Sequence, residues 1–425
     1  MPTFPVSDLI RVVSIVPFFT RIGDDAAADM RVWMDDLRAA GVRFDVVSLR
    51  TQGFLDAIVR RMDHVDRAEA PLPTQAADAV ATLLRGCSAR FSLHAASERL
   101  VLLARGMGYY QLDLTLACGG ADAVASLAGC LKRLRLLLID LIEGTAALPA
   151  PSLPLRDTLV ASLAARRSAV APAERRMAPW EMHWSYSINQ LLVPAVSADA
   201  SMPLQPGDLD RLGVGLCGKN EGGEAAGDDV AELGEGLAAH GFTGTTVLLD
   251  GSAAAERACF LLGLLQSYNS LLLLLNDALH GATLEPPPDH GTRARRDFVA
   301  RLQRLQSETQ IAIHESMPAS NCTTELDGLI YERGHAARAM DGAIDALEKG
   351  LGTVRSRIAT VDAAIETSAE RRRQFLLAAI AVVGLYSPVR DLATAFVAPA
   401  LVPLVPLAAI LVSVVVCCML FLRRT

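Results

Sequence analysis

The sequence lacks the residue spacings that mark most metal, redox and catalytic sites. It has eight cysteines, but no two of them show the C-x-x-C spacing of a zinc or thiol redox site. Its eight histidines show no metal-ligand spacing, and no nucleophile elbow or ordered Ser/His/Asp set is present. We therefore predict a non-enzymatic protein with no catalytic residues, cofactor or metal. Scattered single cysteines favour a reducing compartment.

The chain also lacks an excess of positive charge. Its 40 basic and 47 acidic residues give a net charge of −7 and an isoelectric point near 5.7. A nucleic-acid-binding domain usually carries a basic face. The composition therefore excludes nucleic acid as a predicted partner.

One stretch nearly matches a phosphate-binding loop. Gly213, Gly218 and Lys219 have the P-loop spacing. However, Asn220 stands where a Ser or Thr would ligate Mg²⁺, and residues 221–229 form a Gly-rich acidic stretch instead of a helix N-terminus. We interpret residues 213–220 as a solvated loop.

Long apolar stretches are concentrated towards the C-terminus, in a chain that is 51% hydrophobic with a mean hydropathy of +0.30. Residues 375–389 follow Arg371-Arg372-Arg373, and the uncharged residues 404–422 precede Arg423-Arg424. We predict a two-helix transmembrane hairpin over residues 375–422. Basic clusters at both outer ends predict that both termini are cytoplasmic, with the lipid bilayer as a partner. The alternative is a single C-terminal span, with residues 375–389 as a buried soluble helix.

The N-terminal segment does not have the pattern of a secretory signal. Residues 1–19 lack a basic n-region, and Arg11 interrupts their apolar run. The Val, Ile and Phe content instead predicts a buried strand over Leu9–Phe19. We therefore expect the bulk of the protein in the cytoplasm, anchored to the cell inner membrane.

A heptad pattern precedes the apolar stretches. Apolar residues recur in steps of four and three, which is the a/d seam of a coiled coil. We predict a helical stalk over residues 292–374, including one continuous helix over residues 324–385. The seam packs either against copies of itself or against the protein's own helices, and the pattern leaves both readings open. Its members are Met340, Ile344, Leu347, Leu351, Val354, Ile358, Val361 and Ile365.

The rest of the chain alternates between strand-like and helical segments, which predicts an α/β cytoplasmic domain. Pro-rich residues 149–154 divide it into two α/β subdomains, residues 1–148 and 155–285. Strands are predicted at residues 43–49, 90–94, 100–104, 109–117, 184–196 and 245–249. Helices are predicted at residues 26–40, 121–142, 228–239 and 253–280. The last of these is apolar, but polar residues such as Gln266 and Asn269 favour a buried core helix over a third span.

The C-terminal quarter resembles the CorA-type magnesium channels. Like them, it has a long stalk helix leading into a first span, a short external tip and a second span with a basic tail. The resemblance implies an oligomeric pore with its mouth at the tip, and it assigns Tyr386, Ser387 and Asp391 as pore-mouth candidates. The family's Gly-Met-Asn motif is absent, because residues 384–388 read Gly-Leu-Tyr-Ser-Pro. The alternative is that the three residues only cap the hairpin.

A large cytoplasmic domain joined to a small transmembrane module also resembles the membrane effectors of bacterial antiphage systems. The leading hypothesis is thus a homo-oligomeric inner-membrane protein, in which a cytoplasmic domain senses a ligand or protein partner and the hairpin forms a gated pore. One alternative is a CorA-like divalent cation channel. Another is a membrane-anchored scaffold that binds a protein partner.

Overall fold

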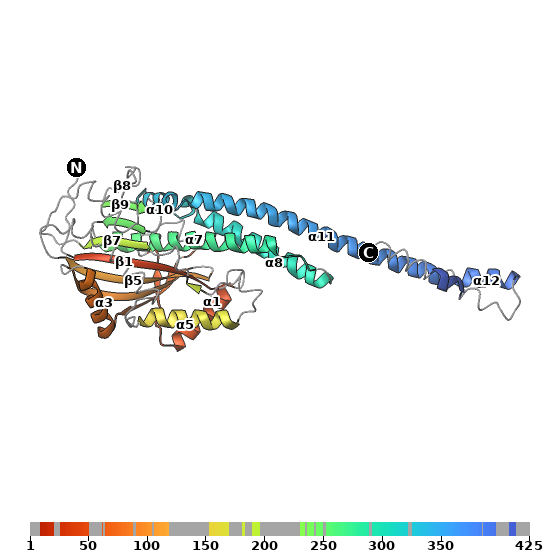
Figure 1. The fold of residues 1–425 in the computed structure, drawn as a ribbon, viewed down its shortest axis with the longest axis horizontal. Helices are drawn as coiled ribbons and strands as arrows, with labels where there is room; N and C mark the ends of the chain where they lie inside the picture. The colour runs from red at the N-terminus through yellow and green to blue at the C-terminus, as the bar shows by residue number, and fades with distance from the viewer. Residues whose placement is uncertain are drawn as a thin grey trace. The chain divides into compact units, whose positions relative to one another are not determined.

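An antiparallel sheet of seven strands forms the centre of the N-terminal part of the computed structural model (Figure 1). The strand order is β2-β3-β4-β5-β1-β6, and β7 also pairs with β1. The strands are β1 (Leu9–Phe19), β2 (Asp45–Ser48), β3 (His64–Pro71), β4 (Phe91–Leu102), β5 (Met107–Cys118), β6 (Glu181–Met182) and β7 (Asn189–Ala195). The structure describes residues 9–20, 26–50, 62, 64–87, 91–103, 106–118, 153–169, 181–182, 189–195, 230–233, 236–241, 244–249, 252–288, 291–321, 325–384, 386–396 and 408–413.

Strand β1 occupies the middle of the sheet and confirms the prediction for Leu9–Phe19. It pairs along its whole length with β5, from Leu9 opposite Ala117 to Phe19 opposite Met107. Its apolar residues from Val12 to Phe19 are fully buried, because both faces of the sheet are covered. The strand therefore reads as a continuous apolar run of β-branched and aromatic residues.

The combination of a sheet with helices was predicted, but the pairings among the described strands are all antiparallel. Strands β4 and β5 are joined by residues 103–106 alone, which are too few for a parallel crossover. Strand β4 also runs unbroken where two separate strands were predicted. Because β7 pairs with β1, the two predicted subdomains, residues 1–148 and 155–285, share one sheet.

Helices cover both faces of this sheet (Figure 1). One face carries α7 (Ser252–Leu284), and the other carries α5 (Pro154–Ala169) with α1 (Ala26–Ala39); α3 (Thr74–Cys87) lies against β4. The indole N–H of Trp33 on α1 donates to Ser162 Oγ on α5 at 2.7 Å. The predicted helix at residues 121–142 lies outside the described residues, as does the loop at residues 213–220.

A second, three-stranded sheet corrects one helix prediction. Residues 228–239 were expected to be helical, but β8 (Val230–Leu233), β9 (Gly236–Gly241) and β10 (Gly244–Leu249) form antiparallel ladders instead. Glycines at 236, 241 and 244 begin or end these strands, and glycine is both unfavourable inside helices and common at turns.

Helix α7 is a core helix, as its polar residues indicated. In its most apolar 18-residue window, 89% of the helix is buried inside the protein. Gln266, Ser267, Asn269 and Ser270 are buried with it. Gly263 permits the close approach of α7 to β5, since a Cβ atom there would lie 2.5 Å from the Tyr109 ring. The protein therefore covers this apolar helix itself.

The C-terminal part is helical and contains α8 (Thr292–Ser316), α9 (Pro318–Asn321), α10 (Glu325–Ala337), α11 (Met340–Gly384) and α12 (Tyr386–Phe396). The prediction of one continuous helix from residue 324 to 385 is wrong, because α10 and α11 are separate. Ala339 between them has φ = 53°, a left-handed conformation that ends an α-helix. The Arg338 guanidinium stabilises this end by donating to the Gly334 carbonyl at 3.0 Å and to Gln266 Oε1 at 2.9 Å.

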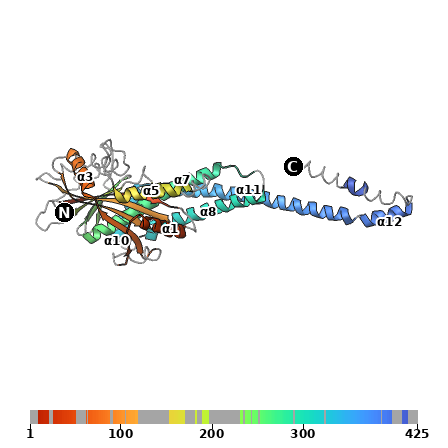
Figure 2. The same cartoon turned by 90° about the horizontal axis from the view of Figure 1, so that it is seen from below.

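The chain divides into two compact units. We call residues Met1–Leu284 with Arg304–Thr353 the head, and Glu285–Gln303 with Val354–Thr425 the tail unit. The head holds both sheets, α7, α10 and the first part of α11. The tail unit holds the start of α8, the rest of α11 and α12, which begins just beyond the end of α11 (Figure 2).

Candidate functional site

Successive side chains of β4 and β5 lie on opposite faces of the sheet, and both faces carry polar residues. On β4, Glu98 faces α5 and its neighbour Arg99 faces α7; on β5, Tyr110 faces α5 while Gln111 and Asp113 face α7. A sheet that is covered on both faces normally buries apolar side chains. The polar residues are therefore the feature of this sheet that calls for an explanation.

On the α7 face, five charged residues are connected by ion pairs of 3.2 Å or less, and we call them the Glu256 network: Arg11, Glu69, Arg99, Asp113 and Glu256. The Glu256 carboxylate on the first turns of α7 accepts from Arg11 Nη1 at 2.6 Å and from Arg99 Nη1 at 2.8 Å. Arg11 also donates to Asp113 at 2.8 Å, and Arg99 to Glu69 at 3.2 Å. The network thus joins β1, β3, β4 and β5 to α7.

The electrostatics of the network favour its charged form. Burial alone would raise the pKa of Glu256, but the guanidinium groups of Arg99 and Arg11 outweigh burial and lower that pKa. Burial likewise opposes the charge of Arg99, while Glu256 and Glu69 raise the pKa of this guanidinium. Glu256 is therefore an ionised anchor that two arginines of the sheet share.

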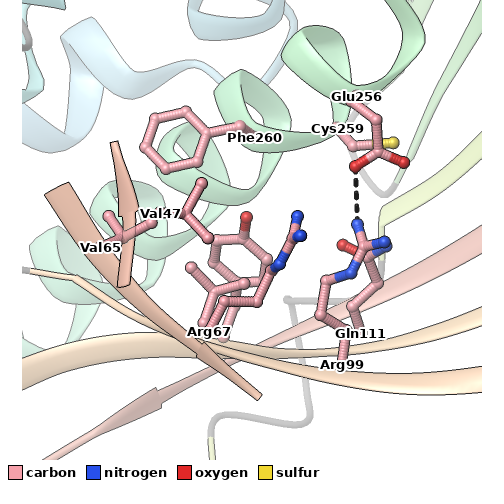
Figure 3. Close-up of a pocket in the computed structure, with 10 residues that line it drawn as sticks. Val47, Val65, Arg67, Arg99, Gln111, Glu256, Cys259 and Phe260 are labelled. Atoms are coloured by element: carbon pink, nitrogen blue, oxygen red, sulfur yellow. Dashed lines mark hydrogen bonds and ion pairs between the residues drawn. The ribbon is translucent and has the colours of Figure 1, made fainter. Parts of the chain in front are cut away.

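A small cavity lies beside the network, between β2–β5 and the first turns of α7 (Figure 3). Its volume is about 20 Å³, which is room for about one water molecule. The Gln111 Oε1 atom at its wall is buried and has no hydrogen-bond partner among the residues that the structure describes. The lining residues are Val47, Val65, Arg67, Arg99, Val101, Tyr109, Gln111, Glu256, Cys259 and Phe260.

The cavity does not have the chemistry of a nucleophilic site. Burial raises the pKa of the Cys259 thiol to about 12, so this sulfur stays protonated and inert near neutral pH. Every carboxylate of the network is already held by an arginine. The arrangement can accept a water molecule or a small polar group at Gln111, and it ties the position of α7 to the sheet.

Comparisons with known proteins do not assign this site. No protein-family model, no curated protein and no solved structure matches the chain.

None of the Glu256 network residues was predicted as a site. The sequence carries one signal, which is Arg11 within the apolar run of β1. A charged residue inside a strand that is buried on both faces needs a partner of opposite charge. Such a residue therefore predicts an ion pair, but the sequence does not identify the partner.

On the opposite face, Glu98 caps helix α5. Its carboxylate accepts the backbone N–H groups of Leu155 at 3.1 Å and Arg156 at 3.0 Å, and the Tyr110 hydroxyl at 3.0 Å. These N–H groups lie in the first turn of α5, where backbone N–H groups have no acceptor within the helix itself. Burial raises the pKa of Glu98, and these hydrogen bonds oppose that rise.

We expect the Glu98→Gln variant to lose about 1–3 kcal/mol of unfolding free energy. The glutamine NH₂ group that replaces one carboxylate oxygen can donate hydrogen bonds but cannot accept them. One of the buried N–H or O–H groups that donate to Glu98 therefore loses its acceptor. Urea unfolding of the detergent-solubilised protein, followed by tryptophan fluorescence, measures the loss. Asp35→Asn, at an exposed pair with Arg38, is the control and should change stability by less than about 1 kcal/mol. Equal stability of the two variants would contradict the capping role of Glu98.

The predicted stalk seam is divided between the two units. Met340, Ile344, Leu347 and Leu351 are buried in the head. Near them, a Cβ atom at Gly350 would lie 3.2 Å from Leu279, so α11 packs closely on α7 there. In the tail unit, Val354 and Val361 are buried, whereas Ile358 and Ile365 are half-buried. The chain's own helices therefore cover the first half of the seam.

The three pore-mouth candidates all lie on α12. Ser387 and Asp391 are exposed and, four residues apart, they share one face of this helix. Tyr386 is the first residue of α12, and its side chain lies outside the described part of the chain. The structure thus places the three residues on one element without testing their role.

Two helical segments of the described chain are long and apolar enough to cross a membrane. The first is α7, which the head buries; the second runs within Met340–Leu392, and none of its most apolar window is buried inside the protein. Phe375, Leu376, Leu377, Ile380 and Val383 on α11 are 43–69% exposed. We call these five residues the apolar surface of α11. Residues 408–413 are helical, with Leu411 and Val412 also exposed, while the rest of residues 397–425 lies outside the described part.

Proposed function

We propose that this chain is an inner-membrane protein with a cytoplasmic sensing head, a membrane-inserted hairpin over residues 375–422 and both termini in the cytoplasm. In a homo-oligomer, the hairpins form a gated pore. The observation that carries the proposal is the apolar surface of α11, which the described part of the protein leaves uncovered. A soluble protein rarely exposes a continuous apolar surface of this kind.

The contrast between α7 and α11 supports membrane insertion. Both helices are apolar enough to span a bilayer, but α7 is buried within the head, whereas α11 is exposed beyond Arg373 in the tail unit. The 15 residues 375–389 would measure about 22 Å as a helix, and a bilayer can thin locally to match a span that is somewhat shorter than its hydrocarbon layer of roughly 30 Å. Lipid is the environment that would cover this surface without a further protein.

The head supports the sensing part of the proposal. The Glu256 network fixes the first turns of α7 to the sheet, and the last turns of α7 pack on α11 at Gly350. A ligand or partner that alters the network would act on the helix that contacts the start of α11. In this respect the chain remains comparable to the membrane effectors of bacterial antiphage systems.

A membrane-anchored scaffold is the second candidate function. It is favoured by the burial of Met340, Ile344, Leu347 and Leu351 within the head, because these seam residues are then not available to join copies of the chain. In this reading the hairpin only tethers the head, and the head binds a protein partner.

Ion flux distinguishes the two candidates. A gated pore is open for a small fraction of the time even without its ligand, so proteoliposomes of the full chain are expected to release K⁺ slowly but above the protein-free background. Asp391→Asn should lower the preference for K⁺ over Cl⁻ by about five-fold, the factor for roughly 1 kcal/mol of lost attraction at the mouth. Asp345→Asn, at an exposed position of α11 in the head, is the control and should leave the preference unchanged. Proteoliposomes that contain the inserted protein but stay as tight as the background would instead support the scaffold.

A further inference from the structure

Three consecutive arginines, Arg371, Arg372 and Arg373, precede the apolar surface of α11. All three side chains are exposed, and the described residues provide an ion-pair partner for none of them. The one nearby carboxylate, Glu370, accepts the side-chain amide of Gln374 at 3.2 Å. The three guanidinium groups are therefore open to a ligand from outside the protein.

Helix geometry spreads these charges around α11. Successive residues of an α-helix are about 100° apart, so three of them cover an arc of about 200°. The next exposed apolar residue, Phe375, starts only about 3 Å further along the axis from Arg373. The arginines thus form a partial girdle that directly adjoins the apolar surface.

We propose that Arg371, Arg372 and Arg373 bind the phosphate groups of anionic phospholipids at the cytoplasmic face of the membrane. This inference rests on the proposed insertion of the apolar surface of α11. The guanidinium fork matches phosphate oxygens in pairs, and a bilayer places its phosphates just outside its hydrocarbon layer. Side chains that diverge around a helix can reach several headgroups at once, whereas a single soluble phosphate would need donors that converge.

The test compares lipids retained by the protein. Full-length protein, delipidated in detergent, is incubated with equal amounts of phosphatidylglycerol and phosphatidylcholine, and bound lipid is counted by native mass spectrometry. Wild type is expected to prefer phosphatidylglycerol. The variant Arg371→Gln/Arg372→Gln/Arg373→Gln should lose at least about ten-fold of that preference, since each basic residue near an anionic headgroup layer contributes about five-fold.

Matched controls separate this site from net charge and from soluble phosphate. Arg304→Gln/Lys349→Gln/Arg355→Gln removes three exposed basic residues elsewhere and should keep the wild-type preference. Inorganic phosphate, added at constant ionic strength, should not displace the bound lipid. The proposal is overturned if wild type binds both lipids equally, if the arginine variant keeps its preference, or if inorganic phosphate displaces the lipid completely. Resistance to carbonate extraction reports insertion separately, so a failure of the proposed function is recognised independently.

Discussion

The double variant Leu377→Asp/Ile380→Asp, made in a shortened chain that ends after Phe396, is expected to leave the membrane, because this chain keeps the apolar surface of α11 but lacks the predicted second span at residues 404–422. Leu377 and Ile380 are 66% and 67% exposed on the apolar surface of α11. At the centre of a span each aspartate costs about 2.5–3.5 kcal/mol on insertion scales. Leu377 and Ile380 lie nearer the cytoplasmic end of the span, so the two aspartates together cost less than about 5–7 kcal/mol. The shortened chain without these substitutions should stay with membranes after carbonate extraction, whereas the double variant should appear in the supernatant.

The control for this experiment introduces the same charges elsewhere. Val32 and Val46 in the head are 53% and 67% exposed, so Val32→Asp/Val46→Asp adds two aspartates to a surface that is already in water. This variant should remain in the membrane fraction. Flotation on a density gradient separates inserted protein from aggregates. If the shortened Leu377→Asp/Ile380→Asp variant floats with membranes as its shortened parent does, the apolar surface of α11 is not embedded in lipid.

Elements with a strong local pattern could be predicted from the sequence. Strand β1, helix α1 and the core helix α7 all follow from runs of apolar residues with a clear period or length. The helix prediction for residues 228–239 is wrong. Their alanines and two glutamates are good helix formers, but the glycines between them allow the tight turns of an antiparallel sheet. The break between α10 and α11 depends on one left-handed alanine, which no local pattern marks.

The contacts of the candidate site could not be predicted, because they join distant parts of the chain. Arg99 and Glu256 are 157 residues apart in sequence, and their pairing follows only from the packing of α7 on the sheet. The element that covers the heptad seam could not be predicted either. Its period predicts that one face of α11 is covered, but the period alone does not say whether a second copy or α7 covers it.

Glu256→Gln is expected to lower the free energy of unfolding by about 3 kcal/mol. Removing one partner of a buried ion pair costs about 3–5 kcal/mol, because the remaining charge loses its compensation. The low end applies here, because the Glu256 side chain is 30% exposed to water and because Arg11 keeps Asp113 and Arg99 keeps Glu69. The substitution preserves the size of the side chain, so the loss reports charge and not packing. Urea unfolding of the solubilised full chain, followed by tryptophan fluorescence with Trp33 fully buried in the head, measures it.

The pH dependence provides an independent readout of the same carboxylate. Because the pKa of Glu256 is lowered in the folded state, its contribution is complete above the unfolded value of about 4.3 and is lost as the pH falls through the folded pKa. The stability difference between wild type and Glu256→Gln should therefore shrink as the pH falls below about 4.3. Comparing the two proteins cancels the opposite effect of Glu98, whose pKa is raised.

The matched control is Glu285→Gln in the tail unit. Glu285 pairs with Arg301 at 2.9 Å, but both side chains are more than one-third exposed, so water screens the pair and its loss should cost less than about 1 kcal/mol. A Glu256→Gln variant that unfolds at the same urea concentration as Glu285→Gln would show that Glu256 does not hold α7 to the sheet. The route by which the head is proposed to act on α11 would then lack its first contact.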